Sequence, residues 1–301
     1  MNTMSDAEPN WEWYRSFAAV LETGSLSAAA RAMGMTQPTV GRHIDGLEAA
    51  LQLKLFTRSF DGFAPTDAAL ELKPYATALV SAAAALRRTA SGHGDGVRGT
   101  VRLTASEVVG VEVLPPILTA LRRQHPELVI ELVLSNQADD LLRREADIAV
   151  RMFAPQQDAL VGQRVGGILL GLHAHVDYLA AHGTPTSVAE LERHTLIGFD
   201  TETAFIRQMQ ARYPMWTRAS LGLRADSDLA NLAALRAGYG IGICQVPLAA
   251  RNPALKRVLP KAFSHRMDTW IAMHEDLRAS ARCAVTFAAV AAGLKAYIAG
   301  G

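Results

Sequence analysis

The chain has little cysteine, few aromatic residues and no excess of charge of either sign. Its 301 residues include two cysteines, Cys244 and Cys283, which lie far apart in the sequence. So sparse a cysteine content excludes a disulfide scaffold and favours a reducing compartment, where two buried thiols are a simpler interpretation than a redox pair. The net charge is +1, so the overall composition gives no sign of a nucleic-acid partner.

Long apolar runs and targeting signals are also missing. No stretch reaches the ~18 uninterrupted apolar residues of a membrane span. The N-terminal residues are acidic and polar and lack the apolar segment of a signal peptide. Half of the residues are hydrophobic, and the length suits two or three domains. We therefore expect a soluble cytoplasmic protein that makes no membrane contact.

Two short amphipathic patterns flank a tight break at Gly34-Met35-Thr36. Apolar residues recur every three or four positions on both sides of the break. They are Leu26, Ala29, Ala30 and Met33 before it, and Val40, Ile44, Leu47 and Leu51 after it. Thr36 suits the N-cap of the second helix, and Pro38 would fall in its first turn, where a missing N–H costs little. A glycine-containing turn between two short helices is the helix-turn-helix pattern.

The N-terminal end of the second predicted helix carries side chains that lie off its apolar face. They are Gln37, Thr39, Gly41 and Arg42. Arginine can hydrogen-bond guanine, and glutamine adenine, in the major groove, where recognition helices present their first turns. N–H groups near Thr36 could also bind a phosphate. For an isolated helix pair, a packing unit with solvated polar residues explains the pattern equally well.

A longer stretch around this pattern resembles the N-terminal domain of LysR-type transcriptional regulators. The matching motifs are ETGSLSAAA (22–30), TQPTV (36–40), the Leu47-Glu48 pair and LFTR (55–58). The resemblance implies a winged helix-turn-helix with its wing at 57–65. Gln37, Pro38, Thr39 and Arg42 would then face bases, with Arg58 near a phosphate or the minor groove. The family usually has serine at the position of Gly41, so the contact there differs, and glycine costs a helix about 1 kcal/mol relative to alanine.

The charge of this first segment runs against a DNA-binding function. Residues 1–64 carry five basic and seven acidic side chains, a balance of −2, whereas a DNA-binding domain usually has a basic footprint. Three of the acids precede Trp13, while Arg42, Lys54 and Arg58 fall on the second helix and the wing. We expect modest affinity per domain, so dimerisation has to supply the rest.

The segment 69–88 reads as one helix with a seven-residue repeat. Leucine and alanine alternate along it at Leu72, Leu79 and Leu86 and at Ala69, Ala76 and Ala83. Such a repeat is a heptad seam, and Pro74 falls on its outward side, where it would kink the helix without blocking the seam. The alternative is an amphipathic helix packed on its own domain. The resemblance favours a linker helix that pairs subunits into a homodimer or homotetramer.

Strands and helices alternate after the glycine-rich residues that follow Ser91. We predict strands at 97–104, 128–134, 147–151, 168–173, 195–199, 221–225, 241–245 and 269–274, and helices at 111–124, 136–145, 188–193, 228–237 and around Phe287, Val290, Leu294 and Ile298. Strand–helix–strand order predicts a parallel sheet with right-handed crossovers. DIAVR (147–151) and RAGYGIGICQVP (236–247) resemble LysR-type effector domains, which implies a two-lobed, periplasmic-binding-protein-like fold.

The predicted fold class is therefore α+β multidomain, with three parts. A winged helix-turn-helix domain covers 1–66 and a linker helix covers 67–92. The α/β effector domain covers 93–301, with lobe I at about 97–167 and 268–301 and lobe II at about 168–265.

Three loops of the second segment carry short polar side chains at the predicted carboxyl ends of strands. They are Ser106, Ser135 with Asn136, and Asp226 with Ser227. Ligands of open α/β sheets bind at this edge, near helix N-termini, so we predict a site for a small polar or anionic effector. Each residue alone could equally be a helix cap. The resemblance places the effector in this cleft, with Ser106 at a commonly used position, and Arg151, Phe199 and Gln245 are further candidates.

Enzymatic and metal sites have little support. His173 and His175 stand two apart, but no third ligand has metal-site spacing. Gly238, Gly240 and Gly242 follow a helix and precede a strand, the reverse of a dinucleotide-binding loop. We predict no catalytic residue and no cofactor. The favoured function is a ligand-responsive transcription factor on double-stranded DNA, and the alternative is an intracellular solute-binding module whose N-terminal domain serves for oligomerisation.

Overall fold

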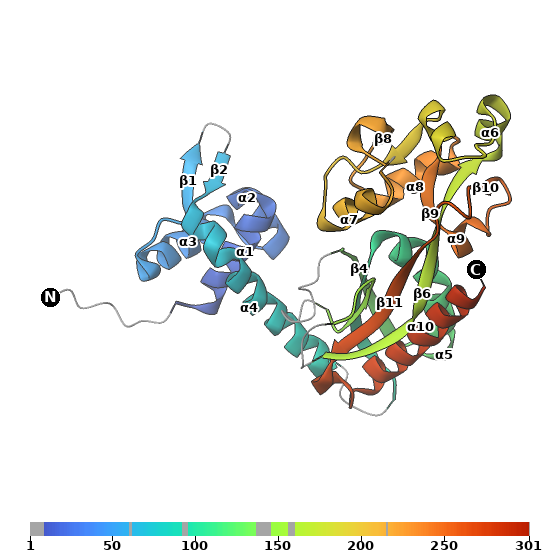
Figure 1. Ribbon diagram of the computed structural model, residues 1–301. Coiled ribbons are helices and arrows are strands. Elements are labelled where there is room, and N and C mark those ends of the chain that lie inside the picture. Colours follow the sequence, from blue (N-terminus) through green and yellow to red (C-terminus); the bar gives the residue numbers. More distant parts are fainter. Residues whose placement is uncertain are drawn as a thin grey trace. The chain divides into compact units, whose positions relative to one another are not determined.

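The chain folds into two compact units that divide near Ala90. The computed structural model describes residues 9–59, 62–91, 96–136, 146–155, 160–214 and 216–300 (Figure 1). Each unit has its own hydrophobic core. The units are therefore described separately.

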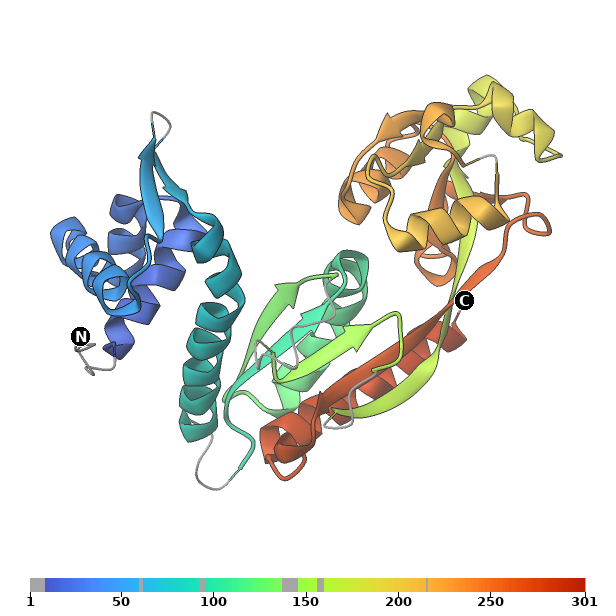
Figure 2. The same ribbon diagram turned by 60° about the vertical axis from the view of Figure 1, so that its left-hand side comes forward.

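The first unit contains the predicted helix-turn-helix and its wing. Its described elements are α1 (Trp11–Thr23), α2 (Leu26–Met33), α3 (Gln37–Leu51), β1 (Phe56–Ser59), β2 (Gly62–Pro65) and α4 (Asp67–Ser91). Thr36 caps α3 by accepting a hydrogen bond from the Thr39 N–H, and Pro38 stands in the first turn, as predicted. Gly34 ends α2 at φ 67°, a left-handed conformation that glycine adopts without strain. The antiparallel strands β1 and β2 project as the wing (Figure 2).

The apolar faces predicted for α2 and α3 form the core of this unit. Val40, Ile44 and Leu47 are buried against the small side chains of Ala29 and Ala30. Phe17 and Val20 of α1 complete the packing on one side, and Leu55 and Phe56 at the start of the wing complete it on the other. The core therefore joins the three helices to the wing in one rigid cluster.

The heptad seam of α4 has two different environments. Ala69 and Ala76 are buried in the core of the first unit, and Leu72 packs against it. Leu79 and Leu86 are 44% and 70% exposed. Packing on its own domain, the alternative raised above, therefore describes the first half of the helix. Ala76 is thus a core residue of the winged domain, and the predicted subunit contacts of the seam stay a prediction.

The second unit is built on a mixed sheet. Its described strands are β3 (Gly99–Ala105), β4 (Leu128–Leu134), β5 (Ile148–Arg151), β6 (Leu160–His175), β9 (Gly242–Gln245), β10 (Leu255–Val258) and β11 (His265–His274). Among the described residues the order is β10-β6-β11-β5-β3-β4, and β9 also pairs with β6. β3 is parallel to both β4 and β5, which confirms the prediction from strand–helix–strand order.

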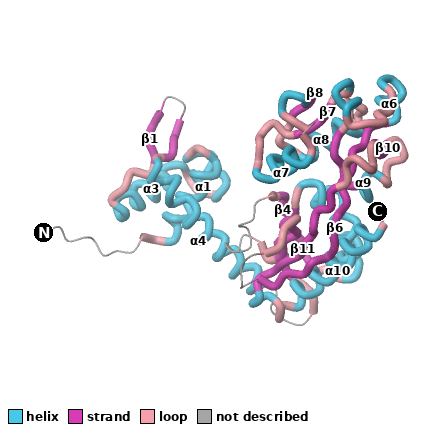
Figure 3. Tube along the Cα trace, in the orientation of Figure 1, coloured by secondary structure: helices cyan, strands magenta, loops and turns pink. Residues whose placement is uncertain are grey.

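Two long antiparallel strands, β6 and β11, carry the chain between the lobes of the second unit (Figures 1 and 3). β6 pairs with β11 up to Leu170 and with β9 and β10 as far as His175. The predicted strands at 168–173 and 269–274 were therefore too short. The reason is that Gly162, Gly166 and Gly167 weaken the local strand signal, while pairing with β11 overrides it.

The remaining described elements pack around the sheet or form the rest of lobe II. They are η1 (Val109–Val113, a π-helix), α5 (Leu114–Gln124), α6 (Val176–His182), η2 (Ala189–Arg193), β7 (Leu196–Gly198), α7 (Ala204–Arg212), η3 (Arg218–Ser220), β8 (Leu221–Arg224), α8 (Asp228–Arg236), α9 (Val246–Ala249), η4 (Glu275–Leu277) and α10 (Ala281–Ala299). β7 and β8 are parallel. The predicted helix at 188–193 is a 3-10 turn, and most of the one predicted at 136–145 lies outside the described residues.

The C-terminal helix α10 is a core helix, as its spacing predicted. Its length and apolar composition would also fit a membrane span. However, Cys283, Val290 and Leu294 are buried and pack into the core of the second unit. Its apolar face is thus already covered within the chain.

Candidate DNA-binding and effector sites

The first two turns of α3 bring together most of the predicted DNA-binding residues. Thr36, Gln37, Pro38 and Arg42 are exposed, and Thr39 and Gly41 are partly exposed. Arg42 Nη2 donates to Thr39 Oγ1 at 3.5 Å, and the hydroxyls of Thr36 and Thr39 lie 2.9 Å apart. Gln37 Oε1 accepts a hydrogen bond from Ser27 Oγ at 2.8 Å. The polar groups of α3 therefore form one exposed surface at its N-terminus.

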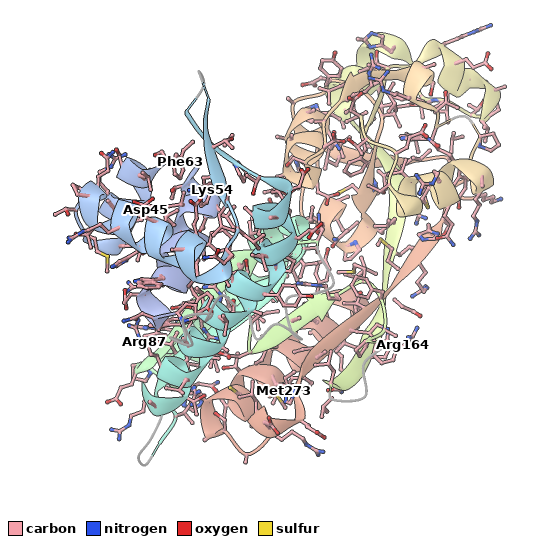
Figure 4. All side chains as sticks on the ribbon, turned by 90° about the vertical axis from the view of Figure 1, so that its left-hand side faces the viewer. Asp45, Lys54, Phe63, Arg87, Arg164 and Met273 are labelled. Carbon is pink, nitrogen blue, oxygen red and sulfur yellow. The ribbon has the colours of Figure 1, made fainter. Side chains whose placement is uncertain are left out.

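The wing is attached to α3 by a buried carboxylate, Glu48, which is 7% exposed. Its Oε1 accepts hydrogen bonds from the Leu55 N–H (2.8 Å) and the Phe56 N–H (3.2 Å), where β1 begins. Its Oε2 pairs with Lys54, which is labelled in Figure 4. Burial raises the pKa of Glu48, but the hydrogen bonds from Lys54, Leu55 and Phe56 outweigh burial and lower it. The carboxylate thus stays ionised and fixes the wing to α3.

Arg58 falls on β1, in register with Phe63 of β2 (labelled in Figure 4). Its side chain lies outside the described residues. Its predicted contact with a phosphate or the minor groove stays a prediction.

The predicted effector residues of lobe I lie together at one edge of the sheet. Ser106 directly follows β3, and Ser135 and Asn136 follow the neighbouring strand β4. The Ser135 N–H donates to Ala105 O at 2.9 Å, which holds the two strand ends side by side. Asn136 Nδ2 reaches Asp228 Oδ2 of lobe II at 3.5 Å.

In lobe II, Ser227 caps α8 and also reaches lobe I. Its Oγ accepts from the Ala230 N–H at 3.3 Å and donates to Glu107 Oε2 at 3.0 Å. Sequence reasoning singled out Ser106 but missed Glu107 beside it, and it missed Asp228. The sequence did contain a signal for Glu107, since it is an acidic residue that stands two positions after the end of β3. Burial, together with the charge of Glu107, raises the pKa of Asp228.

Three other predicted effector residues have structural partners. The Asp226 carboxylate accepts hydrogen bonds from the N–H groups of Asp200 (3.0 Å) and Thr201 (2.8 Å), which closes a loop. Arg151 is buried and donates to Val150 O at 2.9 Å and to Thr104 Oγ1 at 3.0 Å. Gln245 Oε1 accepts from the Tyr297 hydroxyl at 2.6 Å.

Phe199 follows β7 and is partly buried. A separate hollow of about 510 Å³ lies between α5 and α10, away from the loops described above.

The thiols and the paired histidines lie inside the fold. Cys244 and Cys283 are both buried, and burial raises the pKa of Cys244 to about 12. Burial also lowers the pKa of His173 to about 4, and its Nδ1 lies 3.0 Å from Gly171 O. His175 caps α6 by accepting from the Asp177 N–H. Within the part of the chain that the structure describes, no group of three His, Cys, Asp or Glu side chains could hold a metal ion.

A winged helix-turn-helix joined to a two-lobed α/β unit is the architecture of ligand-responsive transcriptional regulators. Residues 11–70 match the family model described as "Bacterial regulatory helix-turn-helix protein, lysR family". Residues 94–295 match the model "LysR substrate binding domain". The chain belongs to the LysR family.

Several curated relatives are transcriptional regulators by name. The chain is 27% identical over 276 residues to the "Probable HTH-type transcriptional regulator LtrA" of Klebsiella pneumoniae, covering 88% of this chain and 89% of the relative. It is 30% identical over 182 residues to an "HTH-type transcriptional regulator" of Xanthomonas campestris pv. campestris, covering 59% of this chain and 52% of that protein. The alignment to the "HTH-type transcriptional activator AaeR" of Escherichia coli spans 59% of its length, at 27% identity and 61% of this chain.

Solved full-length structures share the fold. AphB, a virulence activator of Vibrio cholerae, superposes with a TM-score of 0.61 at 22% identity, covering 93% of this chain and 98% of AphB. CbnR in complex with its target DNA gives a TM-score of 0.65 at 19% identity, covering 94% and 99%. At these identities the likeness concerns the fold alone.

Proposed function

We propose that this chain is a sequence-specific DNA-binding transcriptional regulator controlled by a small-molecule effector. The observation that carries the proposal is the exposed N-terminus of α3, where Gln37 and Arg42 lie outside the core. Glutamine and arginine on the first turns of such a helix are suited to reading base edges in the major groove. The hydroxyls of Thr36 and Thr39 and the helix N–H groups suit a phosphate.

Subunit pairing is the second part of the proposal. Leu79 and Leu86 stand seven residues apart on α4, and both are exposed. Two exposed leucines at this spacing suit a second copy of the helix, as a homodimer or within a homotetramer. Pairing would also offset the modest affinity expected of a single domain with a charge balance of −2.

The third part concerns the effector, which we place at the strand ends of the second unit. Ser106, Ser135 and Asn136 from lobe I and Ser227 from lobe II offer hydroxyl and amide groups there. An effector that binds one lobe arrangement better than another would shift the balance between the two. The protein would act in the cytoplasm and would need no cofactor for this response.

The proposal is tested by fluorescence anisotropy of the full-length protein on DNA from its own upstream intergenic region. Scrambled DNA of equal length and a salt series are run alongside, because phosphate contacts weaken as salt rises. We expect tight, salt-sensitive binding to the upstream DNA alone. Arg42→Ala should weaken that binding by about 1–3 kcal/mol, the usual cost of losing one base contact.

Arg15→Ala is the matched control, because it removes the same charge from α1, where Arg15 pairs with Glu12. Specific binding should survive in that variant. Equal affinity for the two DNAs would instead favour a solute-binding module without DNA reading. Unchanged specific binding in Arg42→Ala would refute the assignment of α3 as the reading helix.

A further inference from the structure

Helix α8 of lobe II is held at both ends by one segment of lobe I. The segment comprises Glu107 to Glu112, one residue after β3, and it overlaps η1 (Val109–Val113), which packs against β3, β4 and α5. α8 packs against β6, β7 and β9. Contacts between the segment and α8 therefore join the two lobes.

At the first end, the carboxylate of Glu107 lies at the N-terminus of α8. Its Oε2 accepts a hydrogen bond from Ser227 Oγ at 3.0 Å and from the Leu229 N–H at 3.4 Å. Unpaired N–H groups and the helix dipole make such a terminus favourable for a negative group. Glu107 supplies that group from the opposite lobe.

At the second end, Glu112 forms a two-pronged ion pair with Arg236, the last residue of α8. The oxygen–nitrogen distances are 2.7 Å and 2.8 Å. The Arg236 side chain, through its hydrogen bond, lowers the pKa of Glu112, and Arg251 of lobe II donates to Glu112 O at 2.9 Å. A bidentate pair of this kind fixes the relative orientation of the two side chains as well as adding energy.

The two ends differ in the charges that surround them. Glu107 faces a like charge, because Asp228 stands close enough for the charge of Glu107 to raise its pKa, in addition to the effect of burial. Repulsion between neighbouring carboxylates opposes the contact that Glu107 makes. The Glu107 end is the one that can release first, while Glu112 and Arg236 remain paired.

The geometry points to Glu107 as an internal ligand of α8. In the absence of an effector its carboxylate holds the two lobes together, and it is displaced when an effector accepts hydrogen bonds from Ser227 Oγ and the Leu229 N–H. This inference rests on the proposed function, since it assigns a mechanism to the same cleft. The effector would have to offer an acceptor group to Ser227 Oγ and the Leu229 N–H. Glu112 and Arg236 would stay paired while lobe II moves.

The test is backbone amide exchange of the full-length protein, read at Leu229 from overlapping peptides across 224–232. Glu107→Ala should speed exchange at Leu229 by about tenfold, as expected when a hydrogen bond to a charged group is removed. Sodium acetate, whose carboxylate can occupy the vacated position, should restore protection, and sodium chloride of equal ionic strength should not. Glu107→Gln, which keeps the side-chain shape, should show the same effect to a smaller extent.

Glu131→Ala is the matched control, because it removes a carboxylate that pairs with Arg102 elsewhere on lobe I, at 3.1 Å. It should leave Leu229 unchanged, and exchange along α10 should be equal in every variant if the fold is intact. Unchanged exchange at Leu229 in Glu107→Ala, or faster exchange that acetate does not reverse, overturns the inference. DNA binding is measured on the same samples. A wild-type protein that does not bind DNA would contradict the proposed function, whereas unchanged exchange at Leu229 in Glu107→Ala would contradict only the present inference.

Discussion

Removing the carboxylate of Glu48 should detach the wing from α3 without unfolding the core around it. Glu48→Ala leaves the N–H groups of Leu55 and Phe56 without their acceptor, and these residues are 0% and 6% exposed. A buried N–H that loses its partner costs about 1–3 kcal/mol, so the two together cost about 2–6 kcal/mol. The ion pair adds little, because Lys54 is largely exposed.

The assay is amide exchange in peptides covering 52–58 of the full-length protein. Since 1.4 kcal/mol is a factor of ten in an equilibrium, exchange at Leu55 and Phe56 should accelerate by about 30-fold or more. Glu48→Gln keeps an oxygen acceptor and should give a much smaller change. Glu71→Ala, which removes an exposed carboxylate from α4, serves as the control. Exchange in Glu48→Ala that equals the wild type would show that the carboxylate does not hold the wing.

The same contact predicts a pH dependence. Because the folded pKa of Glu48 lies below its ordinary value, the ionised form stabilises the fold at neutral pH. That stabilisation is lost as the pH falls through the lowered folded pKa. The protection factor of Leu55, corrected for the intrinsic exchange rate at each pH, should therefore fall in acid in the wild type and stay level in Glu48→Ala.

Three further changes have defined outcomes. Gly240→Ala should destabilise the fold by about 1–3 kcal/mol and lower the melting temperature, because an added Cβ would lie 2.3 Å from Thr195 O. Gly242→Ala is the control, since the atom nearest to an added Cβ there is 3.5 Å away, and an equal loss of stability in that variant would contradict this account. Gly41→Ala should stabilise α3 by about 0.5–1 kcal/mol in thermal unfolding, since nothing lies within 4 Å of an added Cβ. A lower melting temperature of the variant would contradict this prediction. At pH 8 a thiol reagent should label neither cysteine in the native protein and both cysteines in denaturant. Both thiols are buried, and burial raises the pKa of Cys244 to about 12. Rapid labelling of the native protein would show that the core opens.

The first unit could be predicted closely because its local signals agree with its tertiary contacts. Thr36 is both the best available cap and the observed one, and Gly34 takes the left-handed conformation that the break requires. Glu48 shows where such reasoning stops. Its partners lie seven and eight residues further along the chain, and no local pattern indicates that a surface-type side chain turns inward to meet them.

Most strands of the second unit were predicted, but β10 and the contacts between the lobes were not. β4 was predicted with its observed bounds, because its apolar run is interrupted only by Glu131, although Leu128 alone is fully buried. Glu107 meets Ser227 across 120 positions of sequence, and Glu112 meets Arg236 across 124. Such pairs depend on how one lobe is set on the other, which neither periodicity nor capping rules describe. Two short helices, α6 and α7, were missed because few turns give too weak a period.

The continuous strand β6 has a mechanical consequence for the second unit. A strand that belongs to both lobes does not allow them to slide past one another, because sliding would break the ladder with β11. Bending remains possible at one place, where Gly166 has φ 143° and the register with β11 shifts between Thr269 and Trp270. The two strands therefore act as a flexure with a preset bending point. Effector binding in the cleft would therefore change the angle between the two lobes. The size of that change would be limited by how far the two-stranded ribbon of β6 and β11 can twist.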